Sequence, residues 1–442
     1  MTNEVENGAV VAGIPEGGYQ YVRQNPLQYA SARTRNNIHS IYMKIFEIGT
    51  GYTSIPAKMG AATEIVVEEL TRSLRKQGHD VTIVDIKDCN RQANDLPITE
   101  VYMPQFFSST DVKLGALHKL KRVLYSISLT RKLHTLIRQC RDKKIVLHFH
   151  NQYNLFFFLK LTPKSMRERV TIAYTVHSYI WFGKWEDIKD IIKKRYFQEV
   201  YCCQHSDKVF VLNDIVKDML QQHYGVNSDI IVKILNGVNV DVYNNENANQ
   251  TEVERLRSQY GLQGKKVVIQ IGSVCDRKNQ LGTLKLLLPL MRQDSNLFMI
   301  YAGGIIDPVY QNEIRATAER EGVKDRVIYL GEVAPGKQLN NLYALADVAF
   351  INSKSESFAL VIAEALSARK PIFICEEIMR SLDFWGKKEG KGIVRIKSTF
   401  EADLKRMLTD NAYYKEMQEA GRKFIVDEFS WDVAAKAYVE DF

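Results

Sequence analysis

The feature that most constrains the fold is a repeated alternation of short apolar runs with longer amphipathic segments. The apolar runs predict buried strands, and they fall into two series, at 44–49, 81–86, 145–150, 170–177 and 209–212, and at 267–272, 297–302, 327–330, 348–351 and 371–374. A helix is expected between strands, for example from Thr63 to Gln77, with Gly78 placed to end it. Such alternation is typical of parallel sheets that are covered by helices on both faces.

Each series has the length of one doubly wound domain. We therefore predict an α/β protein with two Rossmann-like domains that face a central cleft, where ligands bind beyond the carboxyl ends of the strands. The break is placed after Gly225, so that 43–225 form the first domain and 226–429 the second. The last helix, 430–442, could return to the first domain. Residues 1–42 show no clear period and are treated as an extension without an assigned structure.

The cysteine content and the character of the first residues indicate the cellular compartment in which the protein is expected. The chain of 442 residues has a net charge of +8, six cysteines without a CxxC pair, and a polar, acidic start from Met1 to Gly18. It has no run near the roughly 18 apolar residues that a spanning helix needs. These features predict a cytoplasmic protein without a signal peptide, a disulfide framework or a zinc site.

The basic character is concentrated in one segment. Between Lys113 and Lys144 there are ten Lys or Arg and one acidic residue, Asp142, so this segment carries +9 and the rest of the chain −1. Its apolar residues recur at helical spacing, with Lys113, Lys121 and Arg122 off the stripe formed by Leu114, Leu117, Leu120, Val123, Leu124 and Ile127.

This pattern predicts a basic amphipathic helix in the first domain. Such a helix suits the anionic inner face of a membrane or a lipid-diphosphate acceptor. A helix packed by its apolar stripe, with a solvated basic face, is the alternative. Nucleic acid is not expected as a partner, because no aromatic side chains are interleaved with the charges.

The most informative motif spans 353–366, where a strand runs through a Ser-rich turn into a nearly all-apolar helix. Glu356 precedes the helix, and Glu364 lies inside it, where a carboxylate is costly without a partner or a ligand hydroxyl. Free N–H groups at the start of the helix form a natural diphosphate site, at Phe358, Ala359 and Leu360. In the purely structural alternative, Glu356 caps the helix and Glu364 pairs with a core arginine.

The context of these two glutamates resembles the retaining glycosyltransferases of family 4, of polysaccharide or glycolipid type, which have the two-domain GT-B fold. The resemblance covers roughly Lys44 to the C-terminus. Further stretches agree with the family in order and spacing: 60–64, 78–81, 236–239, 272–274 with Lys278, 327–331 and 342–347. There is no Asp-x-Asp, the metal-diphosphate clamp of the other glycosyltransferase fold, so a metal-independent reaction is expected.

The resemblance assigns roles to individual residues. Glu356 would hold hydroxyls of the donor sugar, Glu364 the ribose hydroxyls, and His177 would contact the donor sugar from the other domain. Lys278 and Arg277 could place positive charge on the departing diphosphate. The loops that would approach the donor contain Gly60, Ala61, Gly272 and Ser273.

Each of these positions also has a purely structural alternative. Arg277 and Lys278 could be a basic pair that caps a helix, His177 a core histidine, and Gly60 an ordinary loop glycine. Two residues after another strand, His150 and Asn151, are weaker candidates for the acceptor side.

The chain also departs from the family pattern. Ser273 stands where the family has Arg, and Asn239 where Asp is typical. Ala359 and Arg369 stand at positions that are usually Gly, and Cys375–Gly390 does not follow the usual Gly-containing turn. These departures concern the donor pocket more than the fold.

The function that these features predict is transfer of a hexosyl group from a nucleotide-diphosphate sugar to a glycan or lipid-linked acceptor, with retention of configuration. UDP is favoured over GDP as the nucleotide, and neither a bound cofactor nor a metal is expected. Two alternatives stay open at this point: a nucleotide-sugar 2-epimerase of the same fold, and a non-catalytic descendant that binds a nucleotide sugar or a glycan.

Overall fold

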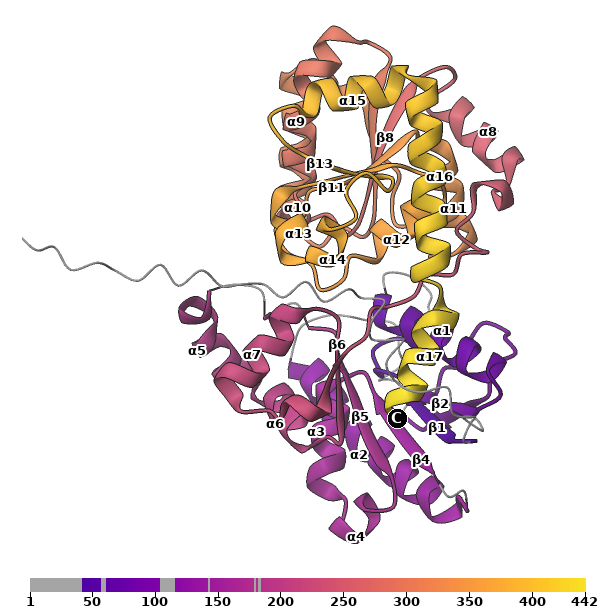
Figure 1. Cartoon of the computed structure of the whole chain (residues 1–442), viewed down its shortest axis with the longest axis vertical. Helices are drawn as coiled ribbons and strands as arrows, with labels where there is room; N and C mark the ends of the chain where they lie inside the picture. Colours follow the sequence, from indigo (N-terminus) through magenta and orange to yellow (C-terminus); the bar gives the residue numbers. More distant parts are fainter. Residues whose placement is uncertain (1–41, 57–60, 104–115, 142–143, 179, 182–183) are drawn as a thin grey trace, which may run out of the picture. The chain divides into compact units, whose positions relative to one another are not determined.

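The computed structural model describes residues 42–56, 61–103, 116–141, 144–178, 180–181 and 184–442. It contains two parallel sheets, each between layers of helices (Figure 1). The first sheet has seven strands in the order β3-β2-β1-β4-β5-β6-β7, and the second has six in the order β10-β9-β8-β11-β12-β13. In both, the strand order reverses beside the first strand of the series. The prediction of two doubly wound α/β domains is confirmed.

All strand pairs are parallel, with β1 between β2 and β4, and β8 between β9 and β11. The ten predicted strands are all present, with ends that shift by at most one residue. Three strands were missed, and each lies at the edge of a sheet: β3, β7 and β13. The strands are β1 Lys44–Ile48, β2 Asp80–Ile86, β3 Ile98–Val101, β4 Ile145–Phe149, β5 Thr171–Val176, β6 Lys208–Val211, β7 Ile231–Lys233, β8 Lys266–Ile271, β9 Leu297–Ala302, β10 Val327–Tyr329, β11 Val348–Ile351, β12 Ile372–Ile374 and β13 Ile393–Arg395.

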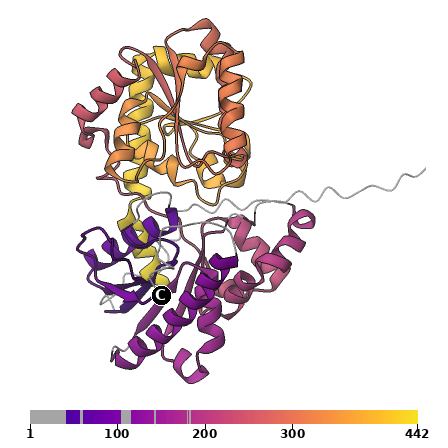
Figure 2. The same ribbon diagram turned by 180° about the vertical axis from the view of Figure 1, so that it is seen from behind.

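Helices cover both faces of each sheet, as Figure 2 shows from behind. One face of the first sheet packs on α1 and α17, and the other on α2, α3, α5, α6 and α7. In the second sheet, α8, α11, α12 and α16 cover one face and α9, α10 and α15 the other. The helices are α1 Ala62–Lys76, α2 Ala116–Gln139, α3 Gln152–Leu161, α4 Lys164–Arg167, α5 Trp185–Arg195, α6 Phe197–His205, α7 Asp214–Tyr224, α8 Gln250–Gln259, α9 Gln280–Gln293, α10 Pro308–Arg320, α11 Lys337–Leu345, α12 Leu360–Ser367, α13 Glu376–Ser381, α14 Asp383–Gly386, α15 Phe400–Thr409, α16 Asn411–Glu428 and α17 Trp431–Asp441.

The first sheet extends beyond the predicted break at Gly225. Strand β7 pairs with β6 and ends at Lys233, so the boundary after Gly225 was set too early. Gly225 has a left-handed conformation, φ 60°, and ends α7. Its sequence signal is therefore a helix stop rather than a domain boundary.

The C-terminal helix α17 packs beside α1 on the first sheet. Its apolar residues Trp431, Ala435, Tyr438 and Phe442 share one buried cluster with Ile45 and other residues of α1 and the first sheet. The side chain of Asp432 also accepts a hydrogen bond from Ser73 of α1, at 2.6 Å.

Helix α2 exists where the basic helix was predicted, but it faces the other way. Its buried stripe is Tyr125, Leu129, Leu133 and Ile137, which follow one another at intervals of four. Lys121 lies on this stripe and is buried, whereas Leu120, Val123 and Leu124 are exposed. The proposed apolar stripe was therefore wrong as a packing face. In the described part of the chain, no helix combines the length and the apolar character needed to cross a membrane.

Candidate functional site

The second sheet brings two loops together where its strand order reverses. Strand β8 is adjacent to β11, and both are parallel, so their carboxyl ends lie at the same edge of the sheet. The loop after β8 contains Gly272, Arg277 and Lys278, and the loop after β11 contains Glu356. The fold thus places the predicted cations and the predicted sugar-binding carboxylate at a switch point, where open α/β sheets bind ligands.

Glu356 lies between two cations. Lys278 Nζ is 2.5 Å from one of its carboxylate oxygens, and Arg277 Nη1 is 3.5 Å from the other. Arg277 also donates to the carbonyl of Ser355, at 2.9 Å. Burial opposes ionisation of Glu356, but the charges of Lys278 and Arg277 outweigh it and hold its pKa below the usual range. Two cations against one carboxylate leave a net charge of +1, which suits an anionic ligand.

The capping alternatives for these residues are wrong. The N-cap position of α12 is Ala359, and no side chain caps that helix. Helix α9 is capped by Asn279, whose side chain accepts from the backbone N–H of Gly282 at 3.2 Å. Lys278 is only 14% exposed, so it is not a solvated residue at a helix end.

The absence of a side chain at Gly272 leaves room for the Lys278 side chain. Its φ is +146°, and a Cβ at this position would lie 3.2 Å from Lys278 Cδ and Cε. A side chain here would therefore strain the backbone and press on the lysine. At the next position, where the family has Arg, the backbone carbonyl of Ser273 accepts from Gln280 at 2.9 Å.

Two positions where Gly is usual have the conformation that Gly favours. Ala359 has φ +64° and Arg369 has φ +58°, and both are in the left-handed region. Phe358 and Ala359 are buried, and α12 begins at the next residue, Leu360. The predicted diphosphate site at this helix start is therefore built on a strained residue.

The divergent segment Cys375–Gly390 packs against the loop that precedes α12. It contains α13 and α14 and contributes Trp385, which is fully buried. The indole N–H of Trp385 donates to the carbonyl of Phe358 at 2.9 Å, and its ring stacks on Phe429. The segment that departs from the family pattern thus helps to hold the start of α12 in place.

Glu364 is buried among tyrosines rather than paired with an arginine. Tyr343 donates to its carboxylate at 3.1 Å, and Tyr243 also contacts it. Burial raises the pKa of Glu364 to about 7, although the hydrogen bonds from Tyr243 and Tyr343 favour ionisation. The core-arginine alternative is therefore wrong, and the carboxylate is available for a ligand hydroxyl.

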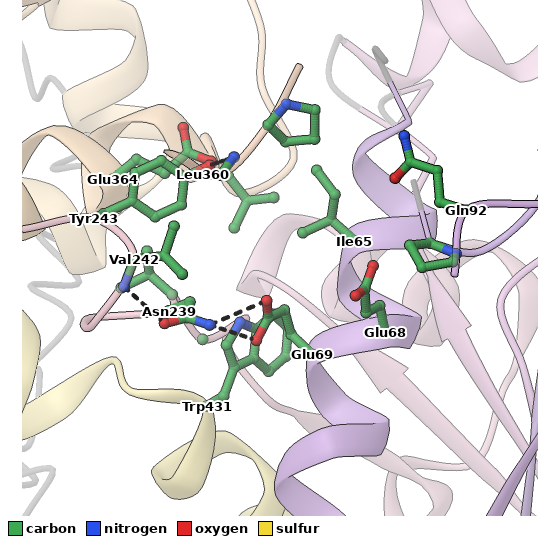
Figure 3. Close-up of a pocket in the computed structure, with 15 residues that line it drawn as sticks. Ile65, Glu68, Glu69, Gln92, Asn239, Val242, Tyr243, Leu360, Glu364 and Trp431 are labelled. Atoms are coloured by element: carbon green, nitrogen blue, oxygen red, sulfur yellow. Dashed lines mark hydrogen bonds between the residues drawn. The ribbon is translucent and has the colours of Figure 1, made fainter. Parts of the chain in front are cut away.

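Glu364 lines a cavity of about 220 Å³. Figure 3 shows Glu364 and Tyr243 on one side of it and Ile65 and Glu68 of α1 on the other. Asn239, where the family has Asp, donates to Glu69 of α1 at 3.0 Å. An aspartate at this position would place a second carboxylate against Glu69, so Asn239 suits its neighbour in this chain.

The first sheet presents its candidates after β4 and β5. His177 follows β5, is half-buried, and contacts His150 through ring nitrogens 3.0 Å apart. The side chain of His150 is fully buried against Glu47, which argues against the predicted role of His150 on the acceptor side. Asn151 is buried and caps α3, where its side chain accepts from Tyr153 N–H at 3.0 Å.

The loop before α1 is described only in part. Gly60 lies outside the described residues, and Ala61 is the buried N-cap residue of α1. The residues predicted from the sequence do not include the two tyrosines on Glu364, the tryptophan that contacts the start of α12, or Glu47, a carboxylate in the buried strand β1. Glu47 carried the same signal that singled out Glu364, since a lone acidic residue in an apolar element needs a partner.

Two family models match consecutive parts of the chain. Residues 63–242 match Glycosyltransferase Family 4, and residues 252–424 match Glycosyl transferases group 1. The chain carries the two domains of a GT-B glycosyltransferase. Residues 243–251 separate the two matches and lie after β7, which agrees with the sheet boundaries seen in the structure.

Curated relatives of this glycosyltransferase are moderately similar. The alpha-monoglucosyldiacylglycerol synthase of Streptococcus pneumoniae is 26% identical over 335 residues, which cover 72% of this chain and 68% of the relative. The N-acetyl-alpha-D-glucosaminyl L-malate synthase of Bacillus anthracis is 22% identical over 329 residues, which cover 73% and 77%.

Solved structures share the fold at lower identity. The catalytic domain of starch synthase IV from Arabidopsis thaliana, bound to ADP and acarbose, has a TM-score of 0.69 at 17% identity and covers 91% of this chain and 98% of its own. HepE of Anabaena, in complex with UDP and glucose, has a TM-score of 0.63 at 15% identity and covers 90% and 98%. These likenesses establish the fold of the glycosyltransferase.

Proposed function

We propose that this glycosyltransferase transfers a hexosyl group from a nucleotide-diphosphate sugar to a hydroxyl of a glycan or lipid-linked acceptor, with retention of configuration. The observation that carries the proposal is the cluster of Lys278, Arg277 and Glu356 at the switch point of the second sheet. It combines an excess of positive charge for a diphosphate with a carboxylate that can accept hydrogen bonds from sugar hydroxyls.

The proposed reaction breaks the bond from the sugar C1 to the diphosphate oxygen and forms a bond from C1 to the acceptor oxygen. The acceptor proton passes to the departing diphosphate. Lys278, Arg277 and the N–H groups at the start of α12 would stabilise the negative charge on the diphosphate as it leaves. Since both oxygens of Glu356 face cations, we assign it to hydroxyl binding rather than to nucleophilic attack, and expect same-face attack by the acceptor.

Donor and acceptor classes follow from relatives and from the surface. UDP is the preferred nucleotide in the proposal, because HepE binds UDP and glucose. A lipid-linked acceptor is supported by the S. pneumoniae relative, an alpha-monoglucosyldiacylglycerol synthase. The exposed Leu120 and Leu124 of α2, next to basic residues, further support a proposed contact with an anionic membrane.

The test is acceptor-dependent release of nucleoside diphosphate with Glu356→Ala. UDP-glucose, UDP-galactose, UDP-N-acetylglucosamine and GDP-mannose would each be offered with diacylglycerol micelles or short glycans. We expect wild-type release to require an acceptor, and Glu356→Ala to lower turnover by roughly 100-fold or more while it keeps its fold.

Glu389→Ala is the matched control. Glu389 also pairs with two cations, Arg395 and Lys397, on the same domain but outside the site, so its removal should leave turnover near the wild-type value. A fully active Glu356→Ala enzyme would contradict the role assigned to Glu356. Conversion of the donor without any acceptor would contradict transfer itself.

A further inference from the structure

One face of the first sheet carries a row of polar side chains within an apolar layer. Alternate residues of a strand point to the same face, and β4 lies between β1 and β5. The polar row therefore shares the face of Ile45, Val146 and Ala173, which α17 covers. Its members are Glu47, His148, His150, Thr175 and His177.

The polar row is connected by hydrogen bonds at short distances. Glu47 contacts His150 Nε2 at 2.8 Å and His148 Nδ1 at 3.1 Å. His150 Nδ1 contacts His177 Nε2 at 3.0 Å, and His148 Nε2 contacts Thr175 Oγ1 at 2.7 Å. The side chains of Glu47, His148 and His150 are fully buried, whereas His177, at the end of the row, is half-buried.

The charges of the polar row decide where its protons lie. Burial opposes ionisation of Glu47, but His148 and His150 outweigh it and lower the pKa of this carboxyl to about 2. Burial lowers the pKa of His150 to about 4, so its ring is neutral at neutral pH. An ionised carboxylate can only accept, so the single ring proton of His150 is on Nε2 and its Nδ1 is an acceptor.

The same reasoning fixes the proton of His177. His150 Nδ1 has no proton to give, so His177 must donate to it from Nε2. Burial lowers the pKa of His177 well below its usual value, which leaves its ring neutral and its Nδ1 without a proton. Among the residues that the structure describes, His177 hydrogen-bonds through Nε2, and no residue hydrogen-bonds to its Nδ1.

We propose that Glu47 and His150 are positioning residues that fix His177 as the Nε2–H tautomer, so that its Nδ1 accepts a hydrogen bond from a hydroxyl of the donor sugar. The contact to the sugar rests on the proposed function, whereas the tautomer rests only on the polar row. Glu47 and His150 act through His177 and touch no substrate themselves. Positioning partners of this kind commonly set the tautomer of a functional histidine.

A metal ion is the competing use of the same residues. Ligand atoms of Glu47, His148 and His150 lie within 4.8 Å of one another. Each of these atoms is already engaged in a hydrogen bond within the polar row, and a metal would have to replace the protons that hold both rings against Glu47. We therefore favour the proton arrangement, and metal content belongs to the test.

The direct test is long-range ¹H–¹⁵N correlation NMR on the full chain with ¹⁵N-labelled histidine, together with metal analysis of the same sample. His177 signals would be assigned by their loss in His177→Gln. We expect protonated Nε2 and unprotonated Nδ1 in the wild type, without added substrate. A proton on Nδ1 of His177, or one bound metal per chain, would overturn the proposal.

Variants of His150 connect the tautomer to turnover. His150→Gln keeps one donor toward Glu47 and one acceptor toward His177, so it should keep the tautomer and most of kcat. His150→Phe removes both, so His177 should become a mixture of tautomers and kcat should fall about tenfold, the worth of one oriented hydrogen bond. Retention of a pure Nε2–H tautomer and full kcat in His150→Phe would overturn the proposal.

His148→Gln is the matched control, because His148 contacts the same carboxylate but its second ring nitrogen bonds to Thr175 rather than to His177. It should change neither the His177 tautomer nor kcat by more than about twofold. If His150→Phe fails to fold, the wild-type spectrum still decides the tautomer. The predicted tautomer in a protein that binds no donor would refute the proposed function alone, because the NMR measurement needs no substrate.

Discussion

Glu356 and Glu364 are eight residues apart, and their surroundings shift their pKa values in opposite directions. Two cations hold the pKa of Glu356 below its usual range, whereas burial raises that of Glu364 to about 7. Different roles for two nearby carboxylates are typical of sites where the environment sets the pKa. Glu356 is therefore an anion beside the proposed diphosphate site, whereas Glu364 changes charge near neutral pH.

The raised pKa of Glu364 makes a prediction about stability. In the unfolded chain this carboxyl loses its proton near its ordinary pKa of 4.5, but in the folded protein it keeps the proton up to about pH 7. Its contribution to folding is therefore present below pH 4.5 and is lost as pH rises through 7. Glu364→Gln, which stays neutral, should gain stability relative to the wild type, on the order of 2 kcal/mol between pH 5 and pH 8.

Thermal unfolding of both proteins at pH 5 and pH 8 measures this difference. Glu428→Gln, which also replaces a carboxylate of the same domain with an amide, is measured alongside as the control for the substitution itself. A difference between Glu364→Gln and wild type that stays constant, or shrinks, from pH 5 to pH 8 would contradict a protonated Glu364 in the folded state.

The site residues that belong to sequence motifs could be predicted, whereas the partners of buried charged residues could not. The predicted positions of Lys278 and Glu356 follow from motifs, and the fold brings them to 2.5 Å of each other. The partners of buried groups were not visible, because Tyr343 lies 21 positions from Glu364, and His150 lies 103 positions from Glu47. A pattern in the sequence can show that a buried charge needs a partner, but only the fold supplies it.

Among the elements, α12 is preceded by an N-cap residue, Ala359, with a backbone conformation that is unfavourable for alanine. Ala359 has φ +64°, where an L-residue costs about 1–2 kcal/mol and Gly costs little. Ala359→Gly should therefore raise the free energy of unfolding by about 0.5–1 kcal/mol, after the larger unfolded-state entropy of Gly is subtracted. Denaturant unfolding measures it.

Ala363→Gly is the matched control, since it lies in the interior of the same helix and is fully buried. It should destabilise the protein by about 1 kcal/mol or more, because Gly is a poor helix former and a buried methyl group is lost. Equal losses in both variants would show that Ala359 is not strained.

Helix α2 shows where periodicity is ambiguous. Two sets of apolar residues recur at helical spacing, and the set that begins with Tyr125 was buried while the set with Leu120 and Leu124 stayed exposed. In the edge strands the signal was weak for another reason. β7 and β13 have three residues each, and edge strands are buried less completely than the central strands that the apolar runs revealed.

The exposed side of α2 predicts binding to anionic vesicles. Leu120 and Leu124 can enter the interface, and each nearby basic residue adds about 1 kcal/mol of attraction to anionic lipid. The protein should float with anionic vesicles, and Leu120→Ser with Leu124→Ser should weaken this several-fold. The control is Ile306→Ser with Val309→Ser, an exposed apolar pair on the second domain. Equal loss in both double variants would contradict binding through α2.

For the whole molecule, strand–helix alternation was enough to predict two doubly wound domains. The boundary between them was less visible, because Gly225 ends a helix and β7 follows it. Helix α17 links the two domains along the chain. It follows α16 of the second domain and covers the polar row on the first sheet. The chain therefore supports its candidate sugar-contacting histidine with its own C-terminus.

Thermal shift measures whether the loops around Lys278 and Glu356 bind a nucleotide-diphosphate sugar, as we propose. A panel of nucleotide sugars and their diphosphates would be added to the wild type and to Lys278→Met. At a ligand concentration 100 times its Kd, binding stabilises the folded state by about 2.7 kcal/mol. We expect one nucleotide sugar and its diphosphate to raise the Tm of the wild type by several degrees, and Lys278→Met to lose most of this shift. No shift with any donor or diphosphate would contradict donor binding at this site.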